Sequence, residues 1–94
     1  IMTTEGGEGP WIATINPVKA NVLVAGKNPV ATDAVATAVM GHDPTGNSPD
    51  APFLRCENHL NIAASMGLGT NKLDEIEVVG ASIETVKKQF HGAE

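Results

Sequence analysis

The sequence predicts an α/β domain, in which a small parallel or mixed sheet packs against helices. Three observations support this prediction. Two short valine-rich runs, residues 19–26 and 75–79, have the composition of buried strands. A helix with recognisable caps lies between Asn28 and Gly41, and a polar segment with three prolines, 42–52, separates it from a second helix. The predicted element order is strand, helix, helix, strand, helix.

The N-terminal region, residues 1–17, opens with closely spaced polar and glycine residues, "TTEGGEGP". This composition predicts a loop, with one weak strand at most near residues 11–15. The run "KANVLVAG" at 19–26 follows, and its valine and leucine content, bounded by lysine and glycine, predicts a strand buried on both faces. Asn28 and Pro29 then begin a helix that we expect to run to Met40.

Gly41 is expected to end this helix in the left-handed conformation. The second helix is predicted over 52–66, and Gly67 ends it, with Leu68 folding back on the last turn. Its apolar residues at helical spacing are Phe53, Cys56, Leu60, Ala63 and Ala64. A second strand is predicted over 75–79, and Ser82 caps a last helix that carries Ile83, Val86 and Phe90.

Strands separated by helices predict a parallel pair joined by a right-handed crossover. Because two strands make a poor sheet, the missing strands must come from residues 1–17, from chain outside the segment, or from another copy. We therefore expect residues 1–94 to be a single segment that belongs to an incomplete domain of a longer protein. Its expected partners are the remainder of its own chain or a homo-oligomer.

Composition excludes several classes of function. Eleven acidic residues against six basic ones give a net charge of −5, the wrong sign for binding nucleic acid. The apolar runs are too short to cross a bilayer, so a soluble segment without membrane contact is expected. Cys56 is the single cysteine, which excludes an internal disulfide and a four-thiolate iron–sulfur cluster, and we expect it to be buried.

Three strings, "EGGEGPW", "VLVAGKNPVATDAVATAVMGHDP" and "MGLGTNKLDEIEVVG", follow one another through most of the chain. In this order they resemble the C-terminal part of proteins grouped as domain-of-unknown-function family 362. Some members carry ferredoxin-like cysteine motifs elsewhere, so the resemblance implies a redox-associated protein whose iron–sulfur cluster would lie outside this segment. We expect a soluble protein of the prokaryotic cytoplasm, with any export signal outside the segment. The family usually has Asp at Asn28, and either residue can cap a helix.

The glycine-rich stretch lacks the Gly-Lys-Ser/Thr ending of a phosphate-binding loop, and its two glutamates would repel a phosphate. Two interpretations are open: turns that need positive φ, or a loop that closes over a ligand or cation. Asp33 poses a similar choice, because it is the only charge in the helix at 29–40. It is either a local helix charge or a carboxylate that faces a cleft.

No metal site is predicted. Asp33 and Asp43 are ten positions apart across a helix, on the order of 12 Å or more, so they cannot share an ion with His42. We expect Asp43 to start the turn before Pro44, and the histidines to lie on the surface.

Ligands of parallel α/β sheets bind at the C-terminal ends of the strands. If the two strands are parallel, Lys27, Asn28 and Ser82 reach the same edge, close to Asp33 and under the glycine-rich loop. The complete set of ligand-binding candidates is Glu5, Gly7, Gly9, Pro10, Lys27, Asn28, Asp33 and Ser82.

The first functional hypothesis is that the segment supplies part of a ligand or cofactor cleft in a redox-associated protein. It holds no cofactor of its own, and neither the reaction nor the ligand is specified by the residues. The alternative is a non-catalytic domain that serves assembly or folding, which a wholly apolar exposed face would favour.

Overall fold

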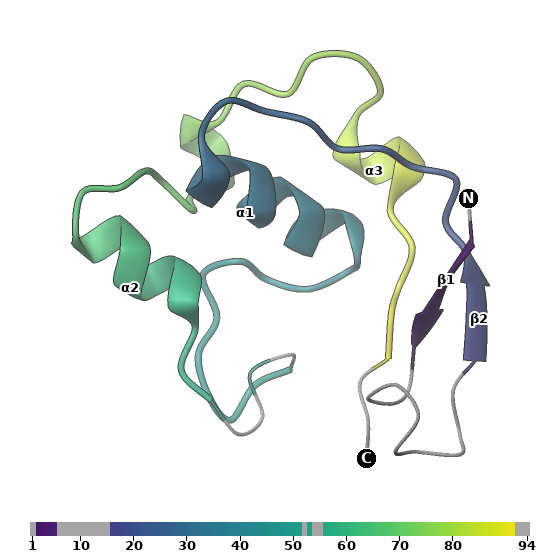
Figure 1. Ribbon diagram of the computed structural model, residues 1–94, viewed down its shortest axis with the longest axis horizontal. Helices are drawn as coiled ribbons and strands as arrows, with labels where there is room; N and C mark the ends of the chain where they lie inside the picture. Colours follow the sequence, from purple (N-terminus) through teal and green to yellow (C-terminus); the bar gives the residue numbers. More distant parts are fainter. Residues whose placement is uncertain (1, 6–15, 52, 54–55, 92–94) are drawn as a thin grey trace.

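The computed structural model describes residues 2–5, 16–51, 53 and 56–91. Three helices and one pair of short strands are present in this part of the chain, joined by long irregular segments (Figure 1). In order, the elements are β1 (Met2–Glu5), β2 (Asn16–Lys19), α1 (Pro29–Val39), α2 (His59–Ser65), the 3₁₀ turn η2 (Leu73–Glu75) and α3 (Ile83–Val86). The helices lie in the predicted order.

The strands differ from the prediction. β1 and β2 pair antiparallel, with Met2 opposite Lys19, and no parallel pair occurs among the described residues. The predicted strand at 19–26 is wrong, because β2 ends at Lys19 and Asn21 adopts a left-handed conformation with φ of 53°. The predicted strand at 75–79 is also wrong, because its first residue lies in η2 and the rest in irregular chain. A strand needs a neighbouring backbone, and neither run has one here.

Helix α1 confirms its predicted caps and ends one residue earlier than predicted. The Asn28 Oδ1 accepts a hydrogen bond from the Ala31 N–H at 3.0 Å, and Pro29 occupies the first turn. Gly41 has a φ of 89°, and its N–H donates to the Ala38 carbonyl at 3.0 Å. The next N–H, of His42, donates to the Thr37 carbonyl at 3.1 Å, which completes a Schellman motif.

Helix α2 is shorter than predicted and begins at His59, after the capping residue Asn58. The predicted start at 52 falls on a residue outside the described part of the chain. Cys56 precedes the helix and is exposed, so the prediction that it is buried was wrong. The C-terminal end agrees with the prediction: Gly67 has a φ of 76°, and the Leu68 N–H donates to the Ala63 carbonyl at 3.1 Å.

The hydrophobic core lies where α1 packs on α2. Val30, Ala34 and Leu60 are buried against one another, and Ala63 and Ile76 pack around them. The side of α1 that carries Val30 and Ala34 therefore forms the contact between the helices.

Three asparagines hold the proline-containing loop against α2. Asn58, with no exposed surface, donates to the carbonyls of Pro44 at 2.8 Å and Gly46 at 2.9 Å, and its Oδ1 accepts from the Leu60 N–H. Asn71 donates to the same Pro44 carbonyl at 3.0 Å and to the Asn61 Oδ1 at 2.6 Å. These bonds satisfy carbonyls that would otherwise be buried without partners.

Helix α3 is a single turn. The Ser82 Oγ accepts from the Thr85 N–H at 3.3 Å, which confirms the predicted cap. The chain after α3 runs beside the C-terminal end of α1, because the Lys88 N–H donates to the Val39 carbonyl at 2.8 Å. Phe90, predicted to lie on the last helix, follows it and is buried at this contact.

Candidate functional site: a valine-rich groove over helix α1

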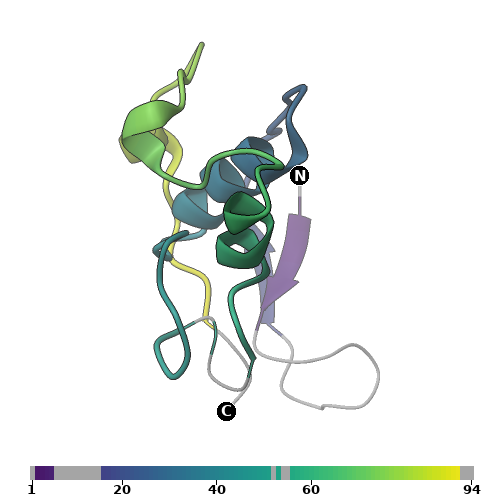
Figure 2. The same cartoon turned by 90° about the vertical axis from the view of Figure 1, so that its left-hand side faces the viewer.

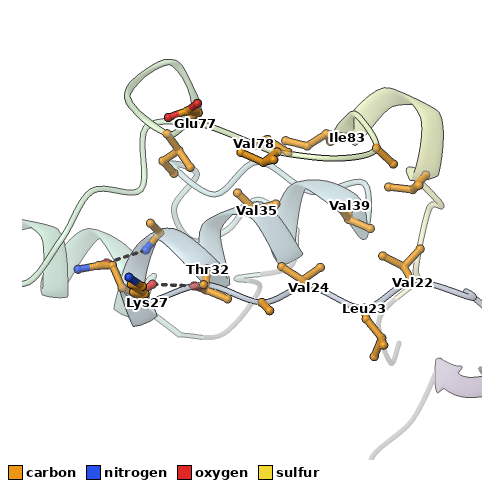
Figure 3. A pocket seen from close by; sticks show the side chains of 18 residues that line it. Val22, Leu23, Val24, Lys27, Thr32, Val35, Val39, Glu77, Val78 and Ile83 are labelled. Carbon is orange, nitrogen blue, oxygen red and sulfur yellow. Dashed lines mark hydrogen bonds between the residues drawn. The ribbon is translucent and has the colours of Figure 1, made fainter.

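A groove of about 320 Å³ lies over α1 (Figure 3). One side of α1 forms its floor, with Ala31, Thr32, Val35 and Val39. Two segments form its walls: residues 22–27, named here the first wall, and 76–79, the second wall. In Figure 2 these segments rise on either side of α1. Both walls are the runs that the sequence predicted to be strands.

The first wall runs alongside α1. Figure 3 shows Val22 near Val39 and Lys27 near Thr32, so the wall follows α1 for most of its length in the opposite direction. From Thr32 to Val39 the helix rises about 10 Å at 1.5 Å per residue. Six residues at about 3.3 Å each could span up to about 20 Å, so the wall is long enough to cover this part of the helix.

Most backbone groups of the two walls have no hydrogen-bond partner among the described residues; the exception is the Ile76 N–H, which donates to the Leu73 carbonyl at 3.1 Å. Across the described residues, no hydrogen bond joins the N–H or C=O groups of 22–27 or 77–81 to any other group. Each such group must bond to water, to a part of the chain outside the described residues or to another polypeptide. Extended segments with free backbone groups are the usual templates for pairing with an added strand.

The side chains of the walls are mostly apolar. Figure 3 shows Val24 over α1 and Leu23 pointing away from it, which is the alternation of a strand. Leu23 and Val79 are each 86% exposed. The charged side chains of the groove are Lys27 and Glu77, which lie on opposite walls at the N-terminal end of α1. The groove therefore suits an uncharged occupant over most of its length.

Only some of the predicted site residues come together. Lys27 and Asn28 line the groove, and the Asn28 Nδ2 also donates to the Leu68 carbonyl at 3.0 Å. Ser82 instead lines a second hollow with Gly41, at the other end of α1. The walls run in opposite directions, so their ends do not share one edge.

Asp33 does not line the groove. Its side chain is exposed, and it forms no ion pair with the described residues; its backbone carbonyl accepts a hydrogen bond from the Thr37 Oγ1 at 2.7 Å. This is the position of a solvated helix charge. Glu5 is the last residue of β1, opposite Asn16, whereas Gly7, Gly9 and Pro10 lie outside the described residues.

Asp43 starts a turn, as predicted. Its Oδ1 accepts hydrogen bonds from the Thr45 N–H at 2.9 Å and the Thr45 Oγ1 at 2.7 Å. These two bonds favour the ionised form and hold the pKa of Asp43 below its ordinary value of 3.8.

A pH titration tests this turn. Because the pKa is depressed in the folded state, the stabilisation is fully present above pH 3.8 and is lost as the pH falls through the lower folded value. We expect the Thr45 amide proton, followed by NMR, to shift sharply in that acidic range. The Asp43→Ala variant should lack this transition, and an unchanged titration in that variant would contradict the assignment.

Apart from Lys27, the residues of the groove walls were not among the predicted site residues, and neither were the three loop-binding asparagines. The walls had a sequence signal, their valine content, but it was assigned to buried strands. The described residues contain no group of three or more His, Cys, Asp or Glu side chains placed to hold a metal ion. No described helix is long and apolar enough to span a membrane.

Comparisons of the chain with protein-family models, with curated proteins and with solved structures gave no match.

Proposed function

We propose that this chain is a structural and assembly domain whose valine-rich walls are covered by further polypeptide in the working protein. The observation that carries this proposal is the pair of walls on either side of α1, whose backbones at 22–27 and 77–79 form no hydrogen bond with another described residue. An added strand supplies both backbone hydrogen bonds and apolar side chains. A small apolar molecule would supply apolar contacts but no backbone hydrogen bonds.

Exposure of the wall side chains supports the same function. Leu23 and Val79 project their apolar side chains almost completely into solvent, and both belong to segments with no charge between residues 20 and 26 or between 78 and 79. Monomeric proteins usually protect exposed strand edges with charged residues or proline. Each wall has one charged residue, Lys27 or Glu77, and both lie at the N-terminal end of α1. The remainder of each wall lacks that protection, which favours a covered state.

A fluorescent dye that binds exposed apolar surface, such as anilinonaphthalene sulfonate, tests the proposal. We expect Leu23→Ser to reduce dye binding at least twofold, because Leu23 is 86% exposed at the groove. Leu68→Ser is the matched control, since Leu68 is 57% exposed and does not line the groove. Equal dye binding by both variants and the parent chain would contradict an accessible apolar groove. Circular dichroism checks that each variant keeps its helices.

A second candidate function is the cleft of a redox-associated protein similar to family 362. Its support is the groove volume of about 320 Å³, which lies at the lower end of the range for small-molecule sites, roughly 300–1,000 Å³. Lys27 and Asn28, two predicted ligand residues, line this groove. On this proposal the iron–sulfur cluster is bound by other parts of the protein.

Native mass spectrometry of the full-length protein separates the two functions. A cleft predicts a small molecule bound in one-to-one ratio, which Lys27→Met should release because Lys27 is the groove's cation. Binding of polypeptide without any small molecule would favour assembly.

A further inference from the structure

We draw no further inference here: the strongest candidate, the exposed apolar wall at residues 22–26 beside α1, carries nothing beyond the proposed function, because nothing in the structure shows what covers it.

Discussion

The Leu60→Ala variant is expected to lose about 2–5 kcal/mol of unfolding free energy, as core leucine truncations commonly do. Leu60 is 1% exposed and packs between Val30 and Ala34, at the contact of α1 with α2. Truncation leaves a cavity between α1 and α2. Because each helix is held by its own caps, the two helices cannot move together to fill it. Urea denaturation followed by circular dichroism measures the loss.

Ile62→Ala is the matched control, because Ile62 lies on the same helix and is 46% exposed. It should cost less than about 1 kcal/mol, since almost half of its surface is already in water. Equal losses for the two variants would contradict packing of the helices through Leu60.

The Asn58→Asp variant is expected to be destabilised by about 3 kcal/mol at neutral pH, because the carbonyls of Pro44 and Gly46 would lose the hydrogen bonds that the Asn58 amide donates. The carboxylate could still cap α2 by accepting from Leu60. It would, however, replace the amide that donates to Pro44 and Gly46, so that its oxygens would face their carbonyl oxygens. Denaturation at several pH values provides the measurement.

The sign of the pH dependence distinguishes this effect from simple loss of a cap. Burial beside carbonyl oxygens raises the pKa of the new carboxyl in the folded state above its unfolded value. The variant's deficit should therefore shrink as the pH falls through that raised pKa, because the neutral acid can donate one hydrogen bond. Asn58→Ala has no titrating group, so its deficit should not change with pH. A constant deficit in Asn58→Asp would contradict the buried amide contacts.

The beginnings and ends of helices were predictable because their signals are local. Asn28 caps α1 through a bond to a residue three positions away, and Gly41 and Gly67 end helices with φ values that glycine adopts without strain. Ser82 caps α3 in the same way. Such contacts depend on a few neighbouring residues and not on the remainder of the fold.

The start of α2 was not predicted because its capping residue, Asn58, is held in place by long-range hydrogen bonds. The stripe from Phe53 to Ala64 suggested one helix from residue 52, yet α2 begins only after Asn58. The Asn58 amide is engaged by carbonyls 12 and 14 positions away, and those bonds hold it in the extended conformation of a cap. The spacing of apolar residues along the chain gives no information about contacts between residues 12 or 14 positions apart.

The sequence by itself determined the helix order, the caps of α1 and α3, the glycine stops and the turn at Asp43, all through bonds between residues at most five positions apart. The tertiary structure determined which conformation the valine-rich runs adopt. Their composition favours strands, but a strand exists only where another backbone satisfies its N–H and C=O groups. In this chain β2 pairs with β1, and residues 22–27 and 76–79, which pair with no strand among the described residues, form the walls of a groove.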